Sequence, residues 1–328
     1  MAAVLAAVDR NLHVAPRTDH LVTHWPGDPA AAAMAMRLNA ALHRIARRGD
    51  RPALSALYRN EHDDFDGAVS EALRLHDAEI SAAMAHPTQT NEVSRAAAIL
   101  SALMSVPLAG TSKFDLLELG ASCGLNLNLA RYAYELGGLK HGDPASPVRV
   151  VPEWRGACPP SRPVEIVSAC GVDLNPNDPT DPATSERMLS YVWADQKQRL
   201  QRLELALDLA RVHRPRVERA SAGDWLQEKL RTPQDEGVCR AIFHSMVMQY
   251  LSHEERASIV DSIRAAGEKA DTSRPLAWIS LEWTATRSEV RLLLTHWPDG
   301  RTLHLATCHP YGAWIDWHAD GHELLAGC

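Results

Sequence analysis

The stretch that most constrains the fold covers residues 114–126, where a short apolar segment runs directly into a turn of small residues. Leu116, Leu117 and Leu119 form an apolar run typical of a parallel strand that is covered on both faces, and Glu118 lies near its end. The residues that follow are small enough for the backbone to approach a ligand closely: Gly120, Ala121, Ser122 and Gly124. The sequence therefore predicts a strand and a loop that binds a nucleotide-like ligand. A tight turn that binds nothing is the alternative.

The spacing of the loop narrows the choice of ligand. A nucleoside triphosphate loop would need a Lys after Gly124, which this chain lacks. A dinucleotide loop would need glycines at two positions where this chain has other residues. The pattern Glu118-x-Gly120-x-Ser122-x-Gly124 instead resembles the first motif of class I S-adenosylmethionine (SAM) methyltransferases, with Ser122 at the middle glycine. That resemblance implies SAM as the cofactor, bound by residues from Glu118 to Asn126.

Length and charge exclude some classes of function. The chain has 328 residues, enough for one large domain with an extension, and a net charge of -7. Binding to DNA or RNA without sequence preference needs a basic surface, so no nucleic-acid partner is expected. The N-terminus has no cationic flank, and the most apolar later segment, 100–110, is too short to cross a bilayer. We expect a cytoplasmic protein with no membrane contact and a small-molecule substrate.

The six cysteines include no Cys-x-x-Cys pair, so we expect reduced thiols. His304 with Cys308, or His318 with His322, has the spacing of a metal-binding pair. Neither pair has a clear third ligand nearby, so we interpret these residues as ordinary strand and surface positions. No metal site is expected.

Residues 1–110 are expected to be helical and to form a lid that selects the substrate. Apolar residues at helical spacing predict one helix at about 29–48, ended by Gly49, and another at about 66–85, ended by Pro87.

A dense polar cluster follows at residues 87–95, directly before an apolar helix. Thr90 is placed to cap that helix, with Asn91 and Glu92 in a first turn that favours acidic groups and Arg95 one turn later. Capping alone explains these residues. The alternative is that Asn91, Glu92 and Arg95 line the ligand site and bind the substrate.

From about residue 113, strands alternate with helices. After the binding loop we expect a helix at 125–136, then a loop or small cover over the proline-rich segment 139–163, then a second strand at 164–173. Asp173 ends that strand, where a carboxylate can accept hydrogen bonds from both ribose hydroxyls. A simple turn at this point is the alternative.

A long helix is expected at 185–213 and a short third strand at 216–220. Asp224 and Trp225 follow at the start of another helix. An acidic residue beside an aromatic one is a suitable pair for binding adenine. Asp224 would accept a hydrogen bond from the exocyclic amine, and Trp225 would stack on the ring or line its edge. Asp224 as a helix cap is the alternative.

Polar residues also follow the next two strands. The fourth strand, 239–243, leads into His244 and Ser245, and the fifth, 276–281, leads into Glu282. The other elements expected here are a helix at 254–267, an antiparallel hairpin at 291–297 and 302–307, and a last short strand through residue 317.

Acidic strand ends in this order follow the class I methyltransferase plan over about residues 113–317. Further motifs extend the likeness to nearly the whole chain: Glu-Leu-Gly-Ala-Ser-Cys-Gly-Leu-Asn, Gly-Val-Asp-Leu-Asn-Pro, Gln-Thr-Asn-Glu with Arg95, residues 193–199, Trp-Pro-Asp-Gly and His-Pro-Tyr-Gly. With these motifs the chain resembles the bacterial family called domain of unknown function 2332. The expected fold is α/β, with a Rossmann-like class I methyltransferase sheet, antiparallel C-terminal strands and a helical N-terminal extension. The boundary is expected between 1–110 and 111–328.

The methyl group of SAM is already electrophilic, so such an enzyme must orient a nucleophile, exclude water and in some cases remove a proton. His309 and Glu282 are our first candidates for that base, and His244 and Tyr250 are the others. Each lies at or after a strand end. An ordinary polar residue of a pocket is the alternative at each position.

The leading hypothesis is SAM-dependent methyl transfer to a small molecule. A methyltransferase-like scaffold that binds a metabolite or partner without transferring methyl is a second hypothesis, and a SAM-independent enzyme of specialised metabolism is a third. Ser122 in place of a glycine, and the absence of the crossover helix that this fold would place after the fifth strand, favour the second hypothesis. The sequence does not name the acceptor or the oligomeric state.

Overall fold

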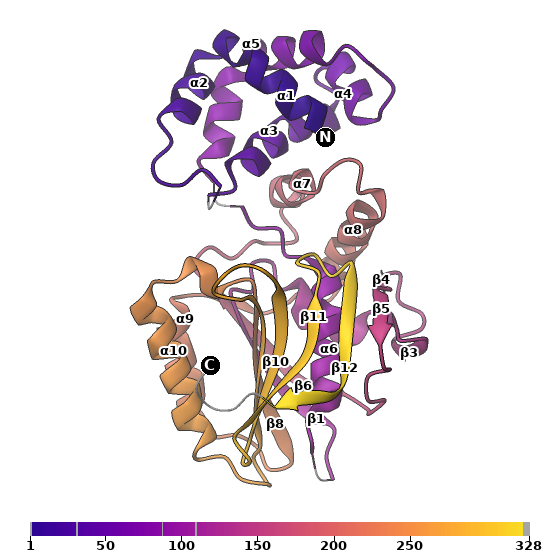
Figure 1. Ribbon diagram of the computed structural model, residues 1–328, viewed down its shortest axis with the longest axis vertical. Helices are drawn as coiled ribbons and strands as arrows, with labels where there is room; N and C mark the ends of the chain where they lie inside the picture. The colour runs from indigo at the N-terminus through magenta and orange to yellow at the C-terminus, as the bar shows by residue number, and fades with distance from the viewer. Residues whose placement is uncertain (1, 31, 87, 109, 324–328) are drawn as a thin grey trace. The chain divides into compact units, whose positions relative to one another are not determined.

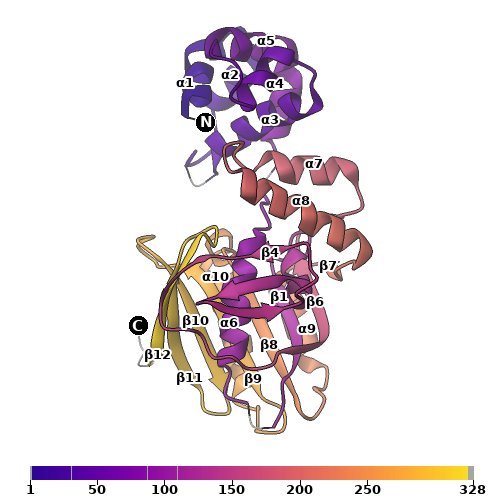
Figure 2. The same ribbon diagram turned by 90° about the vertical axis from the view of Figure 1, so that its right-hand side faces the viewer.

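A computed structural model describes residues 2–30, 32–86, 88–108 and 110–323 (Figures 1 and 2). The chain forms two compact units. The helical unit consists of Met1–Thr90 and Pro179–Glu204, and the sheet unit consists of Asn91–Asp178 and Leu205–Cys328. Residues 91–110, expected to belong with the helices, are thus part of the sheet unit.

The helical unit is built from short amphipathic helices, which carry the labels of Figure 1: α1 (Ala2–Asn11), α2 (Pro16–Thr23), α3 (Met34–Arg48), α4 (Pro52–Tyr58), α5 (Phe65–Met84) and α7 (Pro182–Ser190). The helices expected at 29–48 and 66–85 are confirmed as α3 and α5. Gly49 ends α3 with φ +78°, a left-handed conformation that glycine adopts without strain. The core of this unit joins apolar side chains such as Leu42, Ile45, Leu73 and Ile80, all fully buried.

The prediction of one long helix at 185–213 was wrong. Two helices, α7 and α8 (Lys197–Val212), stand there instead. The chain turns between them at Tyr191 and Val192, whose N–H groups bond back to the carbonyls of Met188 and Leu189. Aromatic and β-branched residues have low helix propensity, and both of these side chains are buried in the turn. Burial in the turn therefore outweighs continuing the helix.

The sheet unit contains a nine-stranded sheet in the order β5-β12-β11-β10-β9-β8-β1-β6-β7. Its strands are β1 (Lys113–Leu119), β5 (Glu153–Gly156), β6 (Glu165–Asp173), β7 (Val217–Arg219), β8 (Val238–Ser245), β9 (Leu276–Trp283), β10 (Val290–Trp297), β11 (Arg301–Cys308) and β12 (Trp314–Glu323). The strands from β7 to β9 run parallel to their neighbours, whereas β9 to β12 are antiparallel. The large sheet is therefore mostly parallel, with an antiparallel C-terminal part as expected.

Helices cover both faces of this sheet: α6 (Ala96–Ser105), α9 (Ala222–Arg231) and α10 (His253–Gly267). Figures 1 and 2 show α9 and α10 on one face and α6 on the other. Leu117 and Leu119 of β1 pack with Leu226 of α9 and Ile259 of α10 in one core. Because side chains alternate along a strand, Leu116 faces the opposite side, and it is also fully buried. This double burial explains the continuous apolar run of β1.

The helix expected at 125–136 was also a wrong prediction. A 3-10 helix, Leu125–Arg131, is followed by a hairpin of β2 (Ala133–Leu136) and β3 (Leu139–Gly142), which forms a small sheet with β4 (Arg149–Val150). The hydroxyls of Tyr132 and Tyr134 donate to the carbonyls of Leu125 and Leu129. Both rings are buried, so these bonds satisfy carbonyl groups that an α-helix would otherwise use. The proline-rich segment 139–163, expected to be a loop or small cover, contains the short strands β3, β4 and β5.

The five described cysteines are free thiols, and Cys328 lies outside the described residues. Within the described ranges, no helix is both long and apolar enough to cross a membrane.

Candidate functional site

The strand order reverses at β1, which has β6 on one side and β8 on the other. Ligands of open α/β sheets bind at such a point, beyond the carboxyl ends of the strands. The loop after β1 begins there with Gly120, at φ +67°. A Cβ atom on Gly120 would lie 2.5 Å from Cγ2 of Val247, which follows β8. The glycine is therefore required by close packing between the two strand ends.

Ser122 occupies the position where the motif has its middle glycine, and it adopts a glycine-like φ of +54°. Its N–H donates to Oδ2 of Asp173 at 2.8 Å. Asn177 holds the other side of Ser122, since its N–H donates to the Ser122 carbonyl at 3.0 Å and its side-chain amide to Oγ at 3.1 Å. Asp173 and Asn177 thus stabilise a backbone conformation that is costly for serine.

Most N–H groups of this loop are already bonded within the protein. Ala121 donates to the carbonyl of Val172, Gly124 to that of Ala121, and Leu125 to Oδ1 of Asn91 at 3.0 Å. The segment after the loop is a 3-10 helix, so it lacks the extended dipole expected of an α-helix. Few backbone N–H groups of this loop therefore remain available for a ligand.

Glu118 supplies the most unusual side chain of the site. It is 2% exposed, and its Oε2 atom has no hydrogen-bond partner among the described residues. Burial raises the pKa of Glu118 well above its usual value and the charge of Asp173 raises it further, whereas a hydrogen bond with Asn126 and the charge of Arg95 lower it. Asn126 is 1% exposed, and its Oδ1 atom also lacks a described partner. Two acceptor atoms are thus buried and unsatisfied beside the loop.

Residues 91–95, the second part of the polar cluster, lie beside the loop after β1 and the end of β8. Asn91, with φ +37°, holds the N–H of Leu125. The capping prediction for Thr90 was wrong, because the Glu92 side chain accepts from the N–H of Ser94 and the first turn is 3-10. Arg95 is 9% exposed. It donates to the carbonyl of Pro310 at 2.9 Å and to that of Ser245, at the end of β8, at 3.3 Å.

The loop between β11 and β12 packs on this cluster. A Cβ atom on Gly312, at φ +65°, would lie 2.8 Å from the backbone carbonyl atoms of Ser94. Nδ1 of His309 accepts from the N–H of Tyr311 at 3.0 Å, so a neutral His309 carries its proton on Nε2. The His309 ring also lies against the ring of Trp314, with centroids 6.0 Å apart. Neutral His309 is therefore arranged as a hydrogen-bond donor.

His244 and Glu282 lie together in a buried network. Nδ1 of His244 is 2.7 Å from Oε1 of Glu282, and Nε2 accepts from the indole N–H of Trp278 at 3.0 Å. The same Glu282 oxygen accepts from the N–H groups of Val247 at 2.9 Å and Met248 at 3.3 Å. Both ring nitrogens of His244 are thus in use, and Glu282 holds the segment after β8.

Backbone strain concentrates at the same place. Of the six described residues other than glycine with positive φ, three belong to this site: Asn91, Ser122 and Met246. Strained residues persist only where the surrounding structure holds them, and they are common at ligand sites.

Tyr250, a candidate base, is 67% exposed just beyond Met246.

Asp224 and Trp225 differ in their surroundings. Asp224 is exposed in the first turn of α9. Trp225 is 2% exposed in the core with Leu226 and Ile259, and its indole N–H donates to Glu218 at 2.7 Å. A base stacked on Trp225 would have to displace core side chains.

Sequence reasoning missed several residues that shape the site: Ser94, Asn177, Val247, Trp278 and Gly312. Asn177 had a detectable signal, because it follows Asp173 in a polar turn. Val247 and Trp278 had none, since their roles depend on strand pairing between distant segments.

The sequence matches a protein-family model over residues 1–317. The family is described as an uncharacterized protein conserved in bacteria, DUF2332. The chain belongs to this family. Comparison with curated proteins and with solved structures gave no match.

Metal-binding side chains do not gather in the part of the chain that the structure describes, where no group of three or more is placed to hold an ion. His304 and His318 lie with ring centroids 4.7 Å apart, and the side chain of His322 lies outside the described part.

Proposed function

We propose that this protein binds SAM at the loop after β1 and transfers its methyl group to a small molecule. The observation that carries the proposal is the buried Glu118, whose Oε2 atom has no described partner at the end of the central strand. In the sheet these parallel strands lie in the order β7-β6-β1-β8-β9. Counted by their order along the chain, they are the third, second, first, fourth and fifth of the five. This arrangement supports a Rossmann-like methyltransferase fold.

Glu118 and Asn126 fit the cationic part of this cofactor. SAM carries an ammonium and a sulfonium, and a cationic donor would satisfy both the unpartnered Glu118 oxygen and its charge. Oδ1 of Asn126 is a second acceptor for the same group. When bound, SAM supplies the methyl group on an electrophilic sulfur. Asp173 and Asn177 hold the loop in shape through Ser122, and Asp173 is proposed as the ribose contact.

The remaining residues fall into two proposed roles. His244, Glu282 and Arg95 fix the ends of β8 and the loop before β12, so we assign them to positioning. Tyr250 and His309 are less buried, and we propose that they contact the acceptor. Asn91 supports the binding loop by accepting from the N–H of Leu125, whereas Glu92 accepts from the N–H of Ser94 in its own segment. A net charge of -7 favours a small acceptor over a nucleic acid.

Isothermal titration with SAM and with S-adenosylhomocysteine tests the proposal. The variants are Glu118→Gln, which keeps the shape and removes the charge, and Asp173→Asn. Glu165→Gln is the matched control, because Glu165 is exposed at the opposite end of β6. We expect SAM to bind the wild type and the control with similar affinity. We expect its affinity for Glu118→Gln to be lower than for the wild type by about tenfold or more. Absence of binding to the wild type would sink the proposal.

A second candidate function is a scaffold or enzyme on this fold that does not use SAM. The buried Trp225 favours it, because this ring does not offer a free face for adenine. A wild type that binds neither ligand, while Glu118→Gln alters binding of a different cationic metabolite, would support this candidate.

A further inference from the structure

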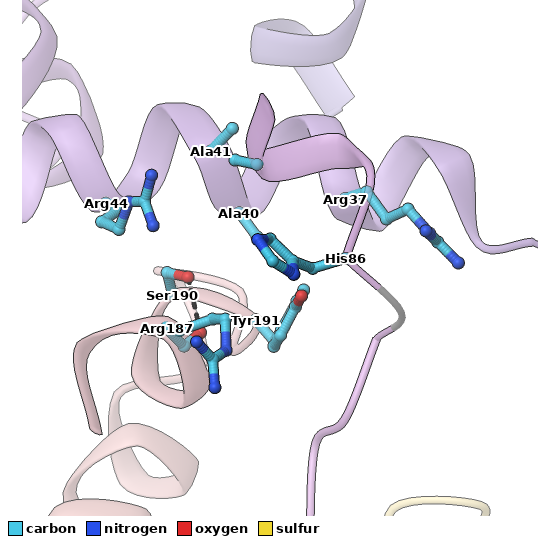
Figure 3. Close-up of a pocket in the computed structure, with 9 residues that line it drawn as sticks. Arg37, Ala40, Ala41, Arg44, His86, Arg187, Ser190 and Tyr191 are labelled. Atoms are coloured by element: carbon cyan, nitrogen blue, oxygen red, sulfur yellow. Dashed lines mark hydrogen bonds between the residues drawn. The ribbon is translucent and has the colours of Figure 1, made fainter. Parts of the chain in front are cut away.

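The helical unit contains a small pocket between α3 and α7 that the function proposed above does not use. Figure 3 shows His86 and Tyr191 between these helices, with arginines around them. The lining residues are Arg37, Ala40, Ala41, Arg44, Ala83, His86, Arg187, Ser190 and Tyr191. We call this the arginine pocket. Its cationic side chains come from segments far apart in the sequence.

No carboxylate lines the arginine pocket, although three arginines do. Arg37 donates to the carbonyls of Ala32 at 2.8 Å and Met84 at 3.0 Å and lies over the Trp25 ring, and it forms no ion pair within the described residues. Its positive charge therefore lacks a protein counter-ion.

Arg44 has a carboxylate partner, but that partner is shared. Glu79 lies 3.2 Å from Arg44 and forms two shorter bonds, of 2.6 and 2.9 Å, with Arg48. The Arg48 guanidinium holds the pKa of Glu79 at about 2; burial opposes this shift, and His76 and Arg44 add smaller effects in the same direction as Arg48. Nε of Arg44 is buried and has no described hydrogen-bond partner. A donor on the pocket wall is thus unsatisfied, which is unusual for a buried guanidinium nitrogen.

The charges of the three arginines act on one group, the hydroxyl of Tyr191. Burial raises the pKa of the Tyr191 hydroxyl, and the charges of Arg187, Arg37 and Arg44 all act on that hydroxyl in the opposite direction. Alanines at positions 40 and 41 leave space beside it. The cavity volume is about 10 Å³, enough for roughly one water-sized group such as a single oxygen of a larger anion.

We propose that the arginine pocket binds an oxyanion, a carboxylate or phosphate group of a small ligand, with one oxygen inside and the rest toward the exposed His86. A guanidinium group can donate two parallel hydrogen bonds to a pair of oxygens in either class, and it remains charged at all relevant pH values. The inference does not depend on methyl transfer.

Thermal unfolding of the full chain tests it, with inorganic phosphate or acetate compared with chloride at constant ionic strength. Phosphate stabilises many proteins by exclusion from their surfaces, so the readout is the difference between variants. Arg187→Gln removes a pocket charge. Arg74→Gln is the matched control, since Arg74 is exposed on α5 and makes no described side-chain bond.

We expect wild type and Arg74→Gln to gain the same shift in unfolding temperature and Arg187→Gln to lose most of it, with about tenfold weaker affinity. A preference for phosphate over acetate, or the reverse, names the class. Equal shifts in all three proteins mean a general salt effect and overturn the proposal. Should Arg187→Gln fail to fold, Arg187→Lys replaces it, because it keeps the charge and loses the planar fork. An undiminished shift there also overturns the proposal.

Discussion

Glu118 shows what a single residue contributes to this site. A carboxyl group that is 2% exposed, with one oxygen unsatisfied, destabilises the fold when it ionises. Proteins keep such groups where a ligand or reaction needs them. The residue is thus both a functional candidate and a measurable weakness.

Replacing Glu118 by Gln should make stability less dependent on pH. The folded pKa of Glu118 lies above its usual value of 4.5, so the wild type is stabilised below that pH and loses stability as pH rises toward the folded pKa. Relative to Glu118→Gln, the wild type should lose about 1.4 kcal/mol per pH unit across that interval. Urea unfolding between pH 4 and pH 9 measures this difference. A difference that stays constant with pH would contradict it, and Glu165→Gln is the control.

His244 should matter more for stability than for proton transfer. Removing its ring in His244→Ala leaves the Trp278 indole N–H and one Glu282 contact unsatisfied, so we expect a loss of about 3 kcal/mol. Trp278→Phe should lower the free energy of unfolding by less, because it leaves only Nε2 of His244 without its donor. Chemical denaturation of both variants and the double variant gives their coupling energy. His253→Ala, at an exposed position, is the control, and additive losses would rule out the network.

At the scale of elements, the loop from His309 to Gly312 depends on close contact with Ser94. Gly312→Ala should destabilise the protein more than Gly300→Ala does, although both glycines have similar φ values of +65° and +69°. A Cβ atom at Gly300 has no neighbour closer than 3.7 Å, so that variant isolates the backbone strain, about 1 kcal/mol. Differential scanning calorimetry of the two variants measures the contrast. Equal shifts would show that the contact with Ser94 is unimportant.

The sequence predicted the large sheet well and the elements beside it less well. β1 was recognisable because an apolar run that is covered on both faces differs clearly from its surroundings. The segment after Gly124 was misread, since the hydroxyls that end its helix come from Tyr132 and Tyr134, whose burial only the tertiary structure reveals. The same limit applies to the site: residues next to a strand end could be named in advance, but Val247 could not.

At the scale of the whole molecule, the helical unit is completed by a segment that is remote in sequence. Nδ1 of His43 lies 3.1 Å from the carbonyl of Ser190, and Arg47 forms two bonds with Glu186, of 3.1 and 3.2 Å. His43 is 3% exposed, so its partner segment also covers it. Residues 1–90 therefore contain only part of the unit.

A fragment of residues 1–90 should consequently unfold at a lower temperature, and less cooperatively, than the same fragment joined to 179–204 by a flexible linker. The reason is that the short fragment leaves His43 and Arg47 without their partners. Circular dichroism melts of the two fragments provide the measurement. His43→Ala in the longer fragment is the control and should lower its melting temperature toward that of the short one. Identical melts of the two starting fragments would contradict this prediction.

The course of the chain also bears on how this protein can evolve. Pro179–Glu204 lies in sequence between β6 and β7, so the helical unit is interrupted by part of the sheet unit. A recombination event that exchanged only the first 90 residues would replace the partner of Ser190, His43, in the recombinant protein. We therefore expect the two units to be exchanged together in evolution; the family model matches residues 1–317 and so includes both.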